Sequence, residues 1–141
     1  MHCDGPKLSN NLIKILQTNT RCKPQNTYNY KYMTLKNITK KTLLSTNLKE
    51  ARSTTDKILG LLRKSNPRSL MFKTRFGIHT FLLKSAIDVL ILDSQNKVVS
   101  VKSLKPNRIF IYNPMHSLVI ELPTGTIQKS KTQKGDKLTF K

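Results

Sequence analysis

The segment Ile87–Leu92 constrains the fold of this chain most, because it is apolar on both faces of an extended strand. Its odd-numbered residues are all Ile or Val, and Asp88 is the one polar residue among its even-numbered positions. A strand that is buried on both faces lies in the interior of a sheet. The following segment, Asp93–Lys97, contains the Asp and Asn residues that favour hairpin turns, so we expect a hairpin leading into a strand at Val98–Val101.

Short apolar runs separated by turn-forming residues continue on both sides of this hairpin. They predict strands at 70–72, 78–83, 108–112, 117–122 and 138–140, a helical or irregular piece at 127–131, and at best one weak edge strand within 35–51. Ser53–Asp56 has the spacing of a helix-capping box, and an apolar stripe follows it, which predicts a helix over about 54–64. Many short strands with one helix near the start predict a mainly β domain, either a small barrel or a sandwich.

The 141 residues fit one domain. We interpret residues 1–46, which are crowded with Asn, Thr, Ser and Lys, as a basic and partly disordered extension, and residues 47–141 as a single β-rich domain. A start at Met33, with the preceding residues as an upstream extension, is a further hypothesis. Cys3 and Cys22 lie in the extension without a second pair of ligands, so we expect two free thiols and no metal site.

The net charge is +19, and the basic residues are spread along the whole chain. A polyanion binder gathers its positive charges on one face, so an even spread indicates nucleic-acid binding only weakly and is also typical of a solvated surface. No apolar run reaches the roughly twenty residues of a membrane span, and the start lacks the pattern of a secretory signal. These features favour a cytoplasmic location.

An ordered set of motifs gives the chain a family resemblance. It consists of Gly60-Leu61-Leu62, Gly77-Ile78-His79-Thr80-Phe81, Ile87-Asp88-Val89 with Leu92-Asp93, Val98-Val99, Leu122-Pro123 with Gly125-Thr126, and Gly135-Asp136 with Leu138 and Phe140. Over about residues 47–141 the chain resembles the domain-of-unknown-function 192 family, also called uncharacterised protein family 0127. The resemblance implies a compact, mainly β, barrel-like domain of prokaryotic proteins with no established activity. The chain departs from the family at Lys84-Ser85-Ala86, where a proline usually precedes the Ile-Asp pair.

Four residues are the candidates for a ligand-binding surface: Arg75, His79, Thr80 and Asp88. An imidazole held by a carboxylate can act as a general base, and Arg75 can bind an anion. The alternative is structural: His79 would bond a carbonyl at the bend, and Asp88 would pair with Arg75 or cap a turn. The structural alternative has more support, so we predict no catalytic residue.

We therefore predict a small, non-enzymatic binding or accessory module without a cofactor or metal. Two alternatives stay open. One is an electrostatic nucleic-acid-binding protein that uses the basic arm at residues 1–46, with a partner that is a polyanion. The other is an acid-base or hydrolytic enzyme that uses His79 and Asp88.

Overall fold

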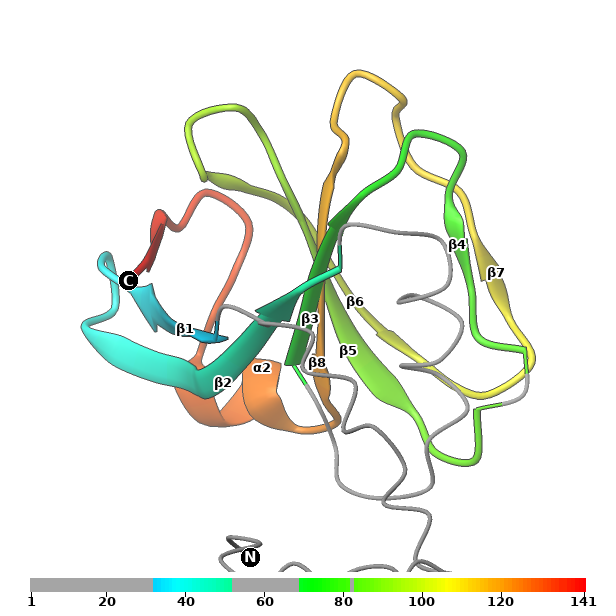
Figure 1. Ribbon diagram of the computed structural model, residues 1–141, viewed down its shortest axis with the longest axis horizontal. Helices are drawn as coiled ribbons and strands as arrows, with labels where there is room; N and C mark the ends of the chain where they lie inside the picture. The colour runs from blue at the N-terminus through cyan, green and yellow to red at the C-terminus, as the bar shows by residue number, and fades with distance from the viewer. Residues whose placement is uncertain (1–31, 52–68, 82) are drawn as a thin grey trace, which may run out of the picture.

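A seven-stranded sheet that curls into half a barrel is the main element of the described fold (Figure 1). The computed structural model describes residues 32–51, 69–81 and 83–141. The strands of this sheet are β1 (Tyr32–Asn37), β2 (Thr42–Glu50), β3 (Ser69–Lys73), β5 (Ile87–Leu92), β6 (Val98–Leu104), β8 (Leu118–Pro123) and β9 (Leu138–Phe140). They lie in the order β6-β5-β8-β3-β2-β1-β9, and every neighbouring pair is antiparallel except β2 and β3.

Two smaller elements complete the described fold. β4 (Ile78–His79) and β7 (Ile109–Phe110) form a separate antiparallel pair, and α2 (Thr126–Ser130) is one turn of helix after β8 (Figure 1). The predicted mainly β, barrel-like architecture is confirmed. The helix expected at about 54–64 lies outside the described residues.

The two ends of the curled sheet come together at one edge. The Val98 amide donates to the Asp136 carbonyl at 2.8 Å, and the Leu138 amide donates to the Asn96 carbonyl at 2.9 Å. These bonds join the start of β6 to the residues around β9, which are at the opposite end of the strand order. The sheet therefore approaches closure, and closure protects edge strands from pairing with other chains.

The sheet has a hydrophobic core on each face. The core inside the curl contains the even-numbered residues of β5 and β8, joined by side chains of the early strands and β9: Leu35, Leu44, Leu48, Met71, Leu90, Leu92, Val98, Ile120, Leu122 and Leu138. The outer core lies toward β4 and β7 and contains Ala51, Leu70, Phe72, Ile78, Val89, Ile91, Leu104 and Val119. Because β5 lies between β6 and β8 and serves both cores, the prediction of a central strand is confirmed.

The turn after β5 also has the chemistry that its sequence predicts. The Asp93 carboxylate accepts hydrogen bonds from the amides of Gln95 (2.8 Å) and Lys97 (2.9 Å), and Asn96 adopts a left-handed conformation with φ of 60°. The bond from the Lys97 amide is the main reason why the pKa of Asp93 lies below its usual value. This hairpin therefore fixes the register of β5 and β6 locally.

The interpretation of the amino-terminal part needs a correction. Residues 32–37 and 42–46 belong to the sheet as β1 and the first part of β2, so the boundary expected at residue 47 falls inside a strand, and two strands replace the single weak one. The fully buried Asn37 anchors β1: its amide nitrogen donates to Asp136 Oδ2 at 2.8 Å and to Thr132 Oγ1 at 3.1 Å. Residues 1–31, including both cysteines, lie outside the described residues.

The strand expected at 78–83 is also shorter than predicted, because the chain turns away after His79. The Thr80 hydroxyl donates to the Lys105 carbonyl at 2.7 Å and accepts from the Arg108 amide at 2.8 Å, which ties the turn to the segment before β7. Gly77 has φ of 91°, and a Cβ atom there would lie 2.7 Å from the Phe110 carbonyl oxygen. Only glycine lets the two segments approach this closely.

Candidate functional site

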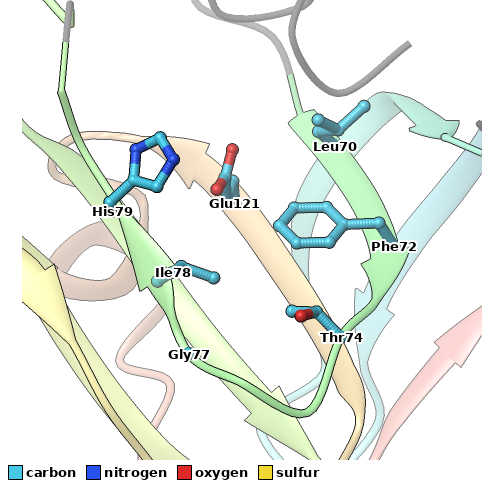
Figure 2. Close-up of a pocket in the computed structure, with 7 residues that line it drawn as sticks. All are labelled: Leu70, Phe72, Thr74, Gly77, Ile78, His79 and Glu121. Carbon is cyan, nitrogen blue, oxygen red and sulfur yellow. The ribbon is translucent and has the colours of Figure 1, made fainter. Parts of the chain in front are cut away.

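A pocket opens where the outer face of the large sheet meets β4. Its volume is about 140 Å³, and its lining comes from β3, the loop to β4, β4 itself and β8 (Figure 2): Leu70, Phe72, Thr74, Gly77, Ile78, His79 and Glu121. Leu70, Phe72 and Ile78 are buried members of the outer core. The pocket is therefore a mostly apolar recess with few polar groups, as small-ligand sites usually are.

Glu121 is the buried charged group of this pocket. It is 9% exposed, and its direct cross-strand neighbours are Leu70 on β3 and Val89 on β5, both buried and apolar. Burial among these side chains raises the pKa of Glu121 to about 7, because desolvation disfavours the charged form. None of the hydrogen bonds of the described residues reaches its carboxyl group, which Figure 2 places between His79 and Phe72 in that view.

His79 is the one sequence-predicted site residue that lines the pocket. Its side chain is exposed, and its ring stacks on Phe81 with 5.1 Å between the ring centroids and 26° between the ring planes. The stacking holds the imidazole at the rim, whereas Glu121 is buried. His79 is thus placed to contact a molecule that enters the pocket.

Asp88 lies on the opposite face of the sheet from this pocket. In the register of β5 and β8, Asp88 is opposite Leu122 and Val89 is opposite Glu121, so the two acids point to opposite faces. Asp88 is 1% exposed, and its two carboxylate oxygens accept from Ser103 Oγ at 2.6 Å and from the Ile127 amide at 2.9 Å. The second bond caps the start of α2. Pairing of His79 with Asp88 is therefore wrong, and Asp88 has the turn-capping role that the sequence offered as the structural alternative.

The remaining two predicted residues lie near the pocket but do not line it. Thr80 is fully buried, and its hydroxyl is taken up by the backbone of Lys105 and Arg108. Arg75 is exposed in the loop between β3 and β4, away from the buried Asp88. Of the four candidates, only His79 meets the pocket, and the acid that accompanies it is Glu121.

The sequence holds one signal that could have revealed Glu121. It is the only charged residue in the otherwise apolar run from Leu118 to Leu122, at a position that alternates onto the same face as Val119. A carboxylate is rarely buried unless it has a partner. A lone acid inside a two-sided apolar strand is therefore a candidate for function, and Asp88 fits the same description but has partners.

The pocket offers binding chemistry more readily than metal chemistry. Among residues 32–51, 69–81 and 83–141, no three His, Cys, Asp or Glu side chains gather into a group that could hold a metal ion. Within the same ranges no helix is long and apolar enough to cross a membrane. A second, wider depression of about 590 Å³ includes Glu50, Lys73 and Asn96, but none of these polar side chains is buried.

Comparisons with known proteins place the chain among prokaryotic proteins of one family. The profile of the DUF192 family, described as "Uncharacterized ACR", matches residues 35–140. A UPF0127 protein of Pyrococcus abyssi is 42% identical over 73 residues, which are 50% of this chain and 62% of that protein. A UPF0127 protein of Pyrococcus horikoshii is 39% identical over 88 residues, 58% of this chain and 76% of that protein.

A solved structure has the same fold. The crystal structure of a protein of unknown function from Novosphingobium aromaticivorans superposes with a TM-score of 0.61 at 12% identity, over 78% of this chain and 84% of that chain. At this identity the likeness concerns the fold alone. The family profile matches most of the sequence, and the two UPF0127 proteins are each similar to half of the chain or more. The chain therefore belongs to the DUF192 family, whose members include the UPF0127 proteins.

Proposed function

We propose that this domain is a non-enzymatic binding module that takes a small, largely apolar ligand into the pocket around Glu121. The single observation that carries the proposal is the Glu121 carboxyl group, which is nine-tenths buried, opens into the pocket and accepts no hydrogen bond from the described residues. An acid in this position costs stability whenever it is ionised. Groups that destabilise a fold are typical of sites that bind or react.

The size of the pocket limits what it holds. A protein cavity of about 150 Å³ lined by apolar side chains holds a benzene molecule, which has six non-hydrogen atoms. The pocket is about 140 Å³, so it suits a ligand, or the end of a larger ligand, of about that size. Leu70, Phe72 and Ile78 would pack against its apolar part, and Glu121 and His79 would make the polar contacts.

Methyl NMR of the full chain tests this proposal. The probes are four molecules of nearly equal size: n-butylammonium, butan-1-ol, butyramide and butyrate. We expect at least one probe to shift the methyl signals of Leu70 and Ile78 in a saturable way. The methyl signals of Leu90 and Leu122, on the inner face of the sheet, should stay in place and serve as the control. If no probe moves the pocket signals at millimolar concentration, the proposal is wrong.

An acid-base enzyme is the second candidate, and the pKa of Glu121 near 7 favours it, because a general acid works best near the ambient pH. In this candidate Glu121 replaces Asp88 as the carboxyl group. The same NMR samples distinguish the two functions. A binding module leaves a bound probe chemically unchanged over days, whereas an enzyme would convert a suitable substrate into a new species.

The nucleic-acid alternative concerns a different part of the chain. Residues 32–46 form β1, the turn after it and the first part of β2, so a binding arm would consist of residues 1–31, which are outside the described residues. This hypothesis predicts that affinity for DNA falls steeply as salt is raised and disappears when residues 1–31 are removed. Affinity that survives the deletion would contradict it.

A further inference from the structure

We propose that the ligand of the Glu121 pocket carries a primary alkylammonium group, whose chain lies between Leu70, Phe72 and Ile78 and whose nitrogen meets the carboxylate of Glu121. This inference rests on the function proposed above and names the chemical class of the ligand. It covers a free alkylamine and a lysine side chain of a peptide, which present the same four-carbon chain and ammonium group.

The negative charge of ionised Glu121 inside the pocket determines which charge on the ligand is complementary. Among the described residues that line the pocket, Glu121 is the one acidic group, and the neighbours on its two adjacent strands, Leu70 and Val89, cannot compensate its charge. A cation that enters beside an ionised carboxylate offsets part of the free energy of desolvation that burial costs the carboxylate. An anion would oppose the ionisation of Glu121, and a neutral ligand could donate a hydrogen bond to the ionised carboxylate but could not balance its charge. A cationic ligand is therefore the complementary one.

The shape of the pocket decides which cation fits. An n-butylammonium ion has five non-hydrogen atoms, which the pocket of about 140 Å³ accommodates. One carboxylate pairs with two of the five N–H donors of a guanidinium group, and the described lining offers no second carboxylate for the other three. The apolar side chains along the walls suit a methylene chain, and Lys-like stems bury their methylene groups in this way. The pocket thus matches an unbranched chain with a compact charge at its end.

The affinity should depend on pH, because the cation pairs with the ionised form of Glu121. Two titratable groups line the pocket among residues 32–51, 69–81 and 83–141, namely Glu121 from β8 and His79 from β4. The lining residues of β3 and the facing residue of β5 are Leu70, Phe72 and Val89, which do not titrate. With a pKa of about 7 the carboxyl group is mostly protonated at pH 5 and mostly ionised at pH 8. If the ammonium ion binds only the ionised form, its affinity rises on the order of a hundredfold between these two pH values.

The experiment is a methyl NMR titration of the full chain with n-butylammonium, butan-1-ol and butyrate at pH 5 and pH 8, with the Leu70 and Ile78 methyl groups as reporters. Nα-acetyl-lysine methylamide is added as a separate arm that represents a lysine side chain on a peptide. We expect n-butylammonium to bind at least tenfold more tightly than butan-1-ol at pH 8. Tighter binding of the lysine derivative than of n-butylammonium would assign the ligand to peptides, and the reverse would assign it to free amines.

Matched variants identify the group responsible. In Glu121→Gln the ammonium ion should lose at least tenfold in affinity, and its advantage over butan-1-ol at pH 8 should disappear. In His79→Asn the rise in affinity between pH 5 and pH 8 should persist. A rise that vanishes in His79→Asn and persists in Glu121→Gln would overturn the inference.

Proton release provides a measurement on the unmodified chain, so it does not depend on the folding of any variant. At pH 6 most of the Glu121 carboxyl groups are protonated, and binding of an ammonium ion should release close to one proton per bound molecule. Saturable binding without proton release overturns the inference. If butan-1-ol or butyrate shifts the pocket signals and n-butylammonium does not, the ligand class is wrong but the binding function stands. If none of the probes shifts them, both are wrong.

Discussion

Replacement of Glu121 by Gln should make the domain more stable at alkaline pH. The usual pKa of 4.5 applies to this group in the unfolded chain, whereas the folded protein raises it to about 7. Between these values the folded chain holds a proton that the unfolded chain has released, so the stability falls as the pH rises. The stabilising contribution of protonated Glu121 is fully present below about pH 4.5, and it is fully lost once the pH has risen above about 7.

The size of this loss follows from the two pKa values. Each tenfold change in proton affinity corresponds to about 1.4 kcal/mol, so ionisation of Glu121 costs about 3 kcal/mol in total. Between pH 5 and pH 8 the wild type should lose about 2 to 3 kcal/mol relative to Glu121→Gln. That is a large share of the 5 to 15 kcal/mol typical of a folded domain.

Urea unfolding of both proteins at closely spaced pH values between 5 and 8 measures the effect. All other titrating groups are shared, so they cancel in the difference between the two stability curves. Asp93→Asn is the matched control: the pKa of Asp93 is lowered from its usual value of 3.8, so the contribution of its carboxylate is lost only below about pH 4, and the stability curve of this variant should run parallel to that of the wild type between pH 5 and pH 8. Parallel curves for the wild type and Glu121→Gln would show that folding does not raise the pKa of Glu121.

Three further substitutions test the packing around the site by thermal or urea unfolding. Asp88→Ala should cost about 1 to 3 kcal/mol, because it leaves the part-buried Ile127 amide without its acceptor, while probe binding at Glu121 stays unchanged; a loss of binding with no loss of stability would contradict its assigned role. Gly77→Ala should cost at least about 1 kcal/mol more than Gly125→Ala, because both residues have positive φ but only Gly77 has a backbone atom within 3 Å of the added Cβ; equal costs would contradict the close approach. Val89→Ala should cost about 2 to 3 kcal/mol, because Val89 is fully buried in the outer core; an unchanged melt would show that this core is misplaced.

The parts of the fold that the sequence predicts are those decided by local chemistry. The central strand β5 is apolar on both faces, the Asp93 turn bonds its own backbone, and β9 follows the turn at Gly135, so each lies where expected. The early strands were underestimated, because β1 and β2 bury few side chains and contain register shifts that break the alternating pattern. Asn37 reads as a loop residue, yet its partner Asp136 lies 99 residues away in the sequence.

The candidate site, too, depends on contacts between strands that local sequence does not reveal. His79 could be predicted because it is the one histidine in the apolar segments at the centre of the sequence, and it does line the pocket. The choice of Asp88 as its partner was wrong, because proximity in sequence says nothing about which sheet face two strands share. That question depends on the register of β5 and β8, which sets Asp88 opposite Leu122 and leaves Glu121 on the pocket face.

The pKa of Glu121 in the full chain shows whether its carboxyl group is buried in the pocket without a compensating partner. Carbon-13 NMR follows the side-chain carboxyl signals as the pH is varied, and the signal that disappears in Glu121→Gln identifies the group. Burial of this group predicts a midpoint near 7, well above the usual value of 4.5. A midpoint at or below 4.5 would mean that the carboxyl group is solvated or paired, and the pocket would then lack the feature on which its proposed function depends.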